Sequence, residues 1–462
     1  MNRSKLLIAT LLGSSVALFF GPKTVIAAET APTFTVCDAA LKLPSVPIKG
    51  LNDWLFIDSE FASNRFAWDF DWGKQYEPLR RFSEALERQG MKLLVIPVPN
   101  RPAIYSEGID RNQPLQGKFS LETARANYND SVEKFRKVGI NTVNIQEAFL
   151  QYTSLQGASE PERLFFARDH HWTPAGARVA AQAIKAQMGT ATLQSLPKAE
   201  YATRMTGMYD FHGNIPDKVE TACPGVRIPN ERIPNYLTER QDGANLLGDE
   251  AIDVALIGSS YSAAPWSPKE LDYNFAGFLQ ENLQTPVVNA AISGGGYDAA
   301  SEAYFLSPAY AQHKPKVVLF EFWYFPYKQQ LNAFRRIIPS IYGACDTEHT
   351  VIADSTVPLE TGAPSVIATS DAKAGIKGAS NYLYFQLSDP SLTNFKVSLE
   401  YDNGQSEIVP VNRNARIKND GRFFLDLNDA FKGNFVKASL LSDAKTTGTV
   451  TARMCRAPAA IR

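Results

Sequence analysis

Two hydrophobic patterns alternate along the chain between about residue 50 and residue 324. Short continuous apolar runs predict strands that are covered on both faces, and apolar residues three or four positions apart predict amphipathic helices. The predicted strands are residues 92–98, 140–145, 253–257, 286–290 and 316–322, and the predicted helices are residues 77–89, 121–138 and 174–188. This alternation is typical of an α/β domain in which a parallel sheet is flanked by helices.

The pattern changes after Cys345, where short segments of alternating polar and apolar residues replace the helical spacing. Turn sequences such as Asp402-Asn403-Gly404 separate these segments and favour tight hairpins. The predicted strands are residues 365–369, 382–387, 395–401, 422–427, 435–441 and 449–454. We therefore predict an α/β domain over residues 29–344 and a small β-sandwich over residues 345–462.

The first 28 residues have the composition of an export signal. Arg3 and Lys5 precede an apolar run over residues 6–20, and small residues that suit a signal peptidase end at Ala28. The run is short for a membrane span, and an uncleaved anchor is the alternative interpretation. We expect the mature protein to work in the periplasm.

Export makes disulfide bonds possible for the four cysteines, Cys37, Cys223, Cys345 and Cys455. Three connectivities are possible in principle. The spacing favours Cys37–Cys223, which would tie the N-terminal arm to the first domain, and Cys345–Cys455, which would bracket the C-terminal segment. In the simple chain model, closing a loop of about a hundred residues lowers the entropy of the unfolded chain and so stabilises the folded protein by roughly 4–5 kcal/mol. Four free buried thiols are the alternative, and no Cys-x-x-Cys spacing supports a zinc or redox site.

Composition and charge exclude some classes of partner. The formal net charge is −1, with acidic and basic residues interspersed, so nucleic acid is not an expected partner. The 462 residues are 44% hydrophobic, which is enough to bury the cores of two or three domains. We expect neither a cofactor nor a metal ion.

The sequence Asp169-His170-His171 stands just before a predicted helix, with Thr173 as N-cap and Pro174 at the first helical position. In an extended segment, residues two apart lie on the same side, so Asp169 could hold the Nδ1–H of His171. Nε2 of His171 would then be free to take a proton from a hydroxyl. His171 is the candidate general base, and Asp169 is the acid that orients it.

The candidate nucleophile is Ser260, in the turn after the predicted strand at residues 253–257. Open α/β sheets build their sites at this end of a strand, and turn amides there can form an oxyanion hole. Ser262 stands where a G-x-S-x-G elbow would have its last glycine, so the ordinary α/β-hydrolase motif is absent. A polar strand-to-helix turn without a catalytic role is the alternative.

Two other interpretations of the histidine pair stay open. Asp169, His170 and His171 could bind a metal, although neighbouring side chains diverge and no third histidine has ligand spacing. The histidines could instead belong to a structural cluster with Trp172.

Three further segments follow predicted strands and should lie at the same edge of the sheet as Ser260. Gly294 and Gly295 would let a ligand approach the backbone closely, and Arg101 could pair with an anionic substrate. Tyr324 belongs to an aromatic cluster of the kind that suits sugar rings. The structural alternatives are a sharp glycine loop and aromatic packing in a core or between domains.

The motifs at residues 54–56, 169–174, 258–262, 273–278 and 293–296, together with the four cysteines, share their order with a known family. The chain resembles the alginate O-acetyltransferases of the AlgX/AlgJ type, which carry an SGNH-hydrolase-like domain. By this resemblance Asp169, His171 and Ser260 are the triad, and Tyr273 lies at an active-site position.

The resemblance to the AlgX branch also implies that the β-sandwich is a carbohydrate-binding module. Its binding face would include Lys396, whereas Glu400 stands where an aromatic platform would be expected.

These features predict a periplasmic polysaccharide O-acetyltransferase that works through an acetyl-enzyme at Ser260. By the resemblance, the acceptor is an acidic exopolysaccharide, most simply the mannuronate residues of alginate. Other biosynthetic proteins would deliver the acetyl donor within a periplasmic complex for polymer assembly and export. A secreted carbohydrate acetylesterase and a noncatalytic polysaccharide-binding scaffold are the alternatives.

Overall fold

The computed structural model describes residues 34–64, 72–155, 163–243, 252–263, 273–323, 333–443 and 448–459. The predicted export signal lies outside these ranges. Within them, every helix is too short or too polar to cross a bilayer.

A four-stranded parallel sheet forms the centre of the first part of the chain. Its strand order is β3-β8-β6-β7, and the strands are β3 (Lys92–Val98), β6 (Val254–Ile257), β7 (Val287–Asn289) and β8 (Val317–Trp323). The predicted strand at residues 140–145 is reduced to one parallel bridge between Val95 and Thr142, because helix α5 begins at Ile145. The predicted parallel sheet is otherwise confirmed.

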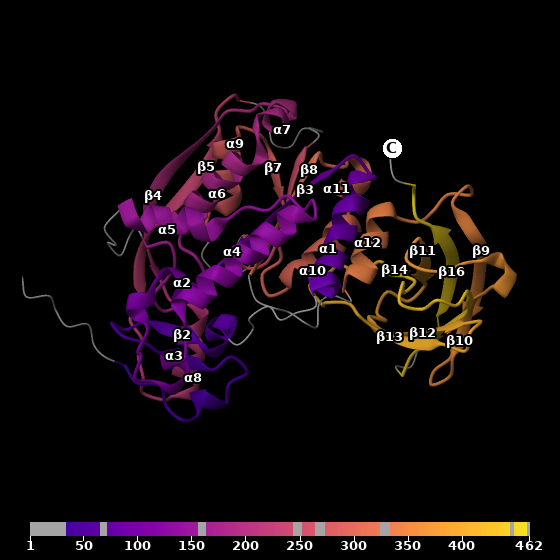
Figure 1. Ribbon diagram of the computed structural model, residues 1–462, viewed down its shortest axis with the longest axis horizontal. Coiled ribbons are helices and arrows are strands. Elements are labelled where there is room, and N and C mark those ends of the chain that lie inside the picture. The colour runs from indigo at the N-terminus through magenta and orange to yellow at the C-terminus, as the bar shows by residue number, and fades with distance from the viewer. Residues whose placement is uncertain are drawn as a thin grey trace, which may run out of the picture. The chain divides into compact units, whose positions relative to one another are not determined.

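Helices cover both faces of this sheet, as Figure 1 shows. In β3, Leu94 and Ile96 pack into a core that also includes α5, α6 and α9, whereas Leu93 and Val95 pack into a core that includes α1, α10 and α12. Side chains on opposite sides of each strand therefore enter different cores, which explains the continuous apolar runs. The helices are α1 (Trp72–Glu87), α2 (Arg101–Ile104), α3 (Pro114–Gly117), α4 (Leu121–Lys137), α5 (Ile145–Leu155), α6 (Pro174–Met188), α7 (Thr190–Ser195), α8 (Asn214–Ala222), α9 (Phe275–Leu283), α10 (Gly296–Phe305), α11 (Pro308–Gln312) and α12 (Phe334–Tyr342).

Two antiparallel strand pairs lie outside the central sheet. Strand β1 (Pro47–Lys49) pairs with β2 (Leu55–Ile57), and β4 (Tyr201–Phe211) pairs with β5 (Glu231–Arg240). The second pair was not predicted from the sequence, because most of β4 is exposed or half-buried and shows no regular alternation. A disulfide joins Cys37 to Cys223, as predicted.

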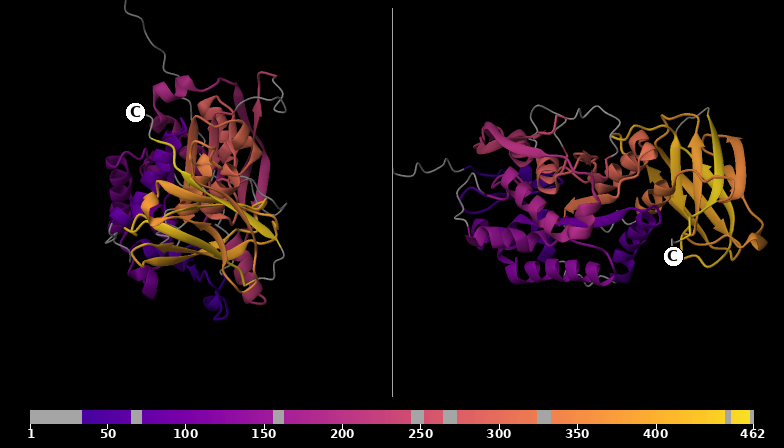
Figure 2. Two further views of the ribbon diagram at one scale, coloured as in Figure 1. Left: turned by 90° about the vertical axis from the view of Figure 1, so that its right-hand side faces the viewer. Right: turned by 90° about the horizontal axis from the view of Figure 1, so that it is seen from above.

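The C-terminal part is a β-sandwich, as predicted, and its strands gather into one block in both views of Figure 2. One sheet has the order β10-β15-β12-β13 and the other β14-β11-β16-β9, with a common hydrophobic core. The predicted pairing of Cys345 with Cys455 is also present. The strands are β9 (Thr350–Pro358), β10 (Ser365–Thr369), β11 (Asn381–Leu387), β12 (Asn394–Tyr401), β13 (Ser406–Asn412), β14 (Arg422–Asp426), β15 (Phe435–Leu441) and β16 (Thr449–Arg456).

Candidate active site

Ser260 lies in the turn that follows β6, at the carboxyl end of the parallel sheet. Strand β6 is buried and pairs with β7 on one side and β8 on the other, so the start of this turn is held from both sides. The amides of Ser262 and Ala263 close the turn by donating to the Ser259 carbonyl at 3.1 and 3.0 Å.

The segment with Asp169 and His171 folds back before helix α6. An antiparallel bridge joins Phe165 to Trp172, and the Thr173 hydroxyl caps α6 by accepting from the Gly176 amide at 3.3 Å. The expected extended conformation is absent, because residues 167–171 form a bend. In this bend, Asp169 Oδ1 accepts from the His171 amide at 3.0 Å, and this local turn brings the two side chains together.

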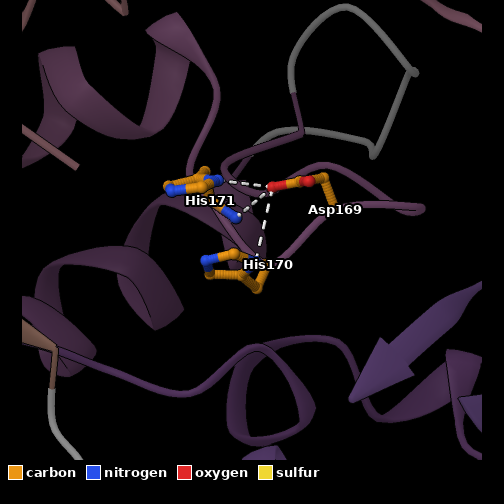
Figure 3. Close-up of side chains that lie close together, drawn as sticks. All are labelled: Asp169, His170 and His171. Atoms are coloured by element: carbon orange, nitrogen blue, oxygen red, sulfur yellow. Dashed lines mark hydrogen bonds and ion pairs between the residues drawn. The ribbon is translucent and has the colours of Figure 1, made fainter. Parts of the chain in front are cut away.

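A chain of hydrogen bonds runs from Asp169 through His171 to Ser260. His171 Nδ1 lies 2.5 Å from Asp169 Oδ1, as Figure 3 shows, and His171 Nε2 lies 2.8 Å from Ser260 Oγ. The other carboxylate oxygen of Asp169 accepts from the Asn214 amide at 2.7 Å. The Asp169 and His171 side chains are 1% and 3% exposed, so bulk water does not compete for these bonds. This arrangement can remove a proton from the Ser260 hydroxyl.

The charge state of Asp169 follows from its neighbours. Burial alone would raise the pKa of its carboxyl, but the imidazoles of His171 and His170 and the hydrogen bonds from His171 hold that pKa well below its usual range. Asp169 is therefore a carboxylate at neutral pH and can stabilise a positive charge on His171.

His170 stacks on His171 with 3.9 Å between ring centroids. Burial, followed by the charge of His171, lowers the pKa of His170 to about 3, so His170 is neutral at physiological pH. Ligand atoms of Asp169, His170 and His171 lie within 4.8 Å of one another, as a metal site would require. Binding a metal through His171 Nδ1 would break its hydrogen bond to Asp169, so the observed bonding favours proton transfer over metal binding.

A cavity of about 510 Å³ opens beside Ser260. His170 and the loop from Gly294 to Gly296 line it. The loop lies at the edge of the sheet where it was expected. Gly294 has a φ of +67°, a conformation that glycine adopts without strain. The amide of Gly295 donates to the Ile292 carbonyl at 3.1 Å. Because that hydrogen bond uses the Gly295 N–H inside the loop, the loop geometry argues against Gly295 as an oxyanion donor.

Tyr273 lies where the resemblance places it, next to the histidine. Its ring centroid is 5.5 Å from that of His171 and 6.0 Å from that of Phe166, and the side chain is buried. A substrate role for Tyr273 stays a prediction.

The prediction that Arg101 binds an anionic substrate is wrong. Its side chain is fully buried and pairs with Glu60 through two hydrogen bonds of 2.6 Å. The remaining donors bind the carbonyl oxygens of Leu55, Phe166 and Ala167. Arg101 follows β3 at the expected edge, but its side chain points into the protein and fastens the segment that leads to Asp169.

We expect Glu60→Gln to lower the free energy of unfolding by about 3–5 kcal/mol, because the Arg101 guanidinium would be left buried without its counter-ion. Urea denaturation measures this change. The matched control is Glu239→Gln, which breaks an ion pair with Arg204 whose side chains are 50% and 59% exposed and should cost at most about 1 kcal/mol. A Glu60→Gln protein as stable as the wild type would contradict this structural role of Arg101.

The three remaining candidate positions are less informative. Lys396, on β12, is exposed and forms an ion pair with Asp443 at 3.5 Å, and it is not among the described residues that line the cavity beside Ser260. Glu400 pairs with Lys437 at 2.7 Å on the same sheet. Tyr324 lies outside the described residues.

One acid at this site, Glu321 in β8, was not predicted from the sequence. Its carboxylate is fully buried and accepts hydrogen bonds from Ser259 and Ser262, which flank the nucleophile candidate. The available signal was a single acid inside the apolar run Val317–Phe322.

Comparison with known proteins decides the family. The model of an SGNH hydrolase-like domain, acetyltransferase AlgX, matches residues 48–324, which is more than half of the chain. The chain belongs to the AlgX family. A C-terminal carbohydrate-binding module matches residues 344–461. This chain thus consists of an SGNH-like α/β domain followed by a carbohydrate-binding β-sandwich.

Similar proteins include both AlgX and AlgJ proteins. The alginate biosynthesis protein AlgX of Pseudomonas aeruginosa is 27% identical over 83% of this chain and 77% of its own length. Its solved structure superposes with a TM-score of 0.75 at 26% identity, covering 92% of this chain and all of the other. The probable alginate O-acetylase AlgJ of Pseudomonas syringae pv. tomato is 28% identical over 66% of this chain and 75% of its own length.

Proposed function

We propose that this AlgX-family protein transfers acetyl groups through Ser260 onto hydroxyls of an exopolysaccharide. The observation that carries the proposal is the unbroken hydrogen-bond chain from Asp169 through His171 to Ser260, beside a cavity of about 510 Å³. Here Ser260 is the nucleophile, His171 the general base and Asp169 the acid that orients His171.

In the first half-reaction, Ser260 Oγ attacks the carbonyl carbon of an acetyl ester while its proton passes to His171 Nε2. Asp169 accepts from Nδ1–H, which keeps Nε2 free as the proton acceptor. The tetrahedral intermediate then collapses, the leaving oxygen takes the proton from His171, and the acetyl group stays on Ser260.

The second half-reaction reverses these roles. A sugar hydroxyl gives its proton to His171 and attacks the acetyl carbon, and Ser260 leaves and regains a proton. The Ser260 amide has no hydrogen-bond acceptor among the described residues and is available to the developing oxyanion. The Gly294–Gly296 loop faces the same cavity, and its remaining amides are further candidates.

The relatives suggest the acceptor. They are named for alginate biosynthesis and, in one branch, for alginate O-acetylation. We therefore take mannuronate residues of alginate as the acceptor, with the carbohydrate-binding module holding the polymer. The export signal and the two disulfides fit work in the periplasm. Other biosynthetic proteins would supply the acetyl donor.

The test incubates the mature protein with 4-nitrophenyl acetate and mannuronate oligomers. Mass spectrometry follows both the protein and the oligomers, with Ser260→Ala protein in parallel. We expect acetylated protein at early times and acetylated oligomers later, neither of which forms with the variant. Release of free acetate alone would instead indicate an acetylesterase. Oligomer binding with no ester turnover would indicate a noncatalytic scaffold.

A further inference from the structure

Glu321 occupies an unusual place for a carboxylate. It lies in β8, one residue beyond Phe320, which pairs with Ile257 at the end of β6. The side chain is fully buried among the strands of the parallel sheet. A charged or polar group in such a place is retained only where hydrogen bonds satisfy it.

Among the described residues, the donors that satisfy Glu321 come from the turn that carries Ser260. Oε2 accepts from the Ser259 amide at 2.7 Å and from the Ser262 hydroxyl at 2.8 Å, and Oε1 accepts from the Ser259 hydroxyl at 2.8 Å. Ser259 comes directly before Ser260, and Ser262 comes two residues after it. One carboxylate therefore holds the turn on both sides of the nucleophile candidate.

The glycine that opens the turn fits the same contact. A Cβ on Gly258 would lie 2.5 Å from Glu321 Oε2 and 2.9 Å from the Ser262 hydroxyl oxygen. Because neither distance is tolerable, a residue with a side chain at position 258 would push the carboxylate away from the turn. The Gly258 backbone and Glu321 thus form one close-packed unit.

Ser260 itself takes no part in these contacts. Its hydroxyl bonds to His171 Nε2 at 2.8 Å, and its amide has no acceptor among the described residues. Reaction geometry tolerates little error in the placement of a nucleophile, and a misplacement of about 1 Å can cost about a hundredfold in rate. The Glu321 bonds restrict the backbone on either side of Ser260 without occupying either of its reacting groups.

We propose that Glu321 is a positioning residue that fixes the Ser259–Ser262 turn, and through it the Ser260 hydroxyl and amide, for acyl transfer. This inference rests on the proposed function. Glu321 acts through Ser259 and Ser262 and does not touch the reacting atoms.

The test compares Glu321→Met, which fills similar volume but accepts no hydrogen bond, with Glu321→Gln. The glutamine side chain would keep one oxygen for the Ser259 amide and the Ser262 hydroxyl, and its NH2 could donate to the Ser259 hydroxyl. With 4-nitrophenyl acetate we expect Glu321→Met to lower kcat by about a hundredfold with KM changed less than about twofold, and Glu321→Gln to retain kcat within about fivefold. A lost charge alone would not give this rescue, because both variants lack the charge, and a loosened fold would lower the melting temperature as well as kcat.

The serine pair supplies an independent arm. The double variant Ser259→Ala/Ser262→Ala should have a kcat lowered at least about tenfold with an unchanged KM. Adding Glu321→Met to this double variant should lower kcat far less than the same substitution does in the wild type. If Glu321→Met does not fold, the serine-pair variant alone decides. The control Asp253→Asn changes a buried acid at the other end of β6 and should leave kcat unchanged.

Three outcomes would overturn the inference. The first is an unchanged kcat in Glu321→Met or in the serine-pair variant, and the second is an equal loss of kcat in Glu321→Met and Glu321→Gln. The third is that the effects of Glu321→Met and of the serine-pair substitutions on kcat are fully additive. The Ser260→Ala protein separates this failure from failure of the proposed function. If that protein still turns over the ester, the proposed function is wrong. If it is inactive while the Glu321 variants keep their kcat, the positioning role alone is wrong.

Discussion

Ser260→Ala should lower ester turnover and acetyl transfer by at least about a thousandfold, which is about 4 kcal/mol of transition-state stabilisation. Without the hydroxyl, no acetyl-enzyme can form, and His171 has no proton to accept from the enzyme. Stability should change little, because among the described residues the Ser260 hydroxyl bonds to His171 alone. Release of 4-nitrophenol and the intact mass of the protein measure the loss of turnover and of the acetyl-enzyme.

The matched control is Ser195→Ala, which removes an exposed hydroxyl at the end of α7. It should have wild-type turnover and the same melting temperature as Ser260→Ala. If Ser260→Ala kept more than about a tenth of the turnover, another residue would be the nucleophile, and the hydrogen bond between His171 and Ser260 would have no catalytic meaning.

The sequence predicted best those elements whose surroundings are uniform along their length. Strand β3 was predicted with its observed bounds, Lys92–Val98, because it is apolar and buried from Leu93 onward and covered on both faces. The β4–β5 pair was missed because an exposed ribbon places few constraints on its residues. Helix α6 was predicted from Pro174 to Met188, because Thr173 and Pro174 mark its start by local chemistry alone.

At the site, the sequence pattern predicted which residues lie near one another but not how their side chains make contact. The proximity of Asp169 to His171 was expected, but through an extended segment, whereas the side chain of Asp169 forms a turn with the His171 amide. The predicted position of Arg101 at the sheet edge was correct, but its side chain points into the protein and not toward a substrate. Glu321 could not be assigned, because its partner Ser259 lies 62 residues away and only the pairing of β6 with β8 brings them together.

Asp169→Asn should lower kcat by about a thousandfold or more while the protein stays folded. The Asp169 carboxylate accepts three hydrogen bonds, from the His171 amide, from His171 Nδ1 and from the Asn214 amide. An asparagine has one acceptor oxygen, so its NH2 must face either the two groups of His171 or the Asn214 amide. If the NH2 faces His171, Nδ1 becomes the acceptor, Nε2 carries the proton, and His171 can no longer take the proton of Ser260. If it faces Asn214, two donors meet and the carboxamide is displaced from His171.

The control for this substitution is Asp217→Asn on helix α8. The Asp217 carboxylate lies 3.7 Å from His212, and its side chain is 64% exposed. The chemical change is the same, and the partner is again a histidine. Because His212 is not the histidine that bonds to Ser260, turnover should be unaffected. If Asp169 served only to pack His171 against Ser260, Asp169→Asn would lower stability without a specific loss of kcat. A thousandfold loss of kcat with a KM near the wild-type value would show that the acid orients His171 during the reaction, because substrate binding does not depend on which nitrogen of His171 carries the proton.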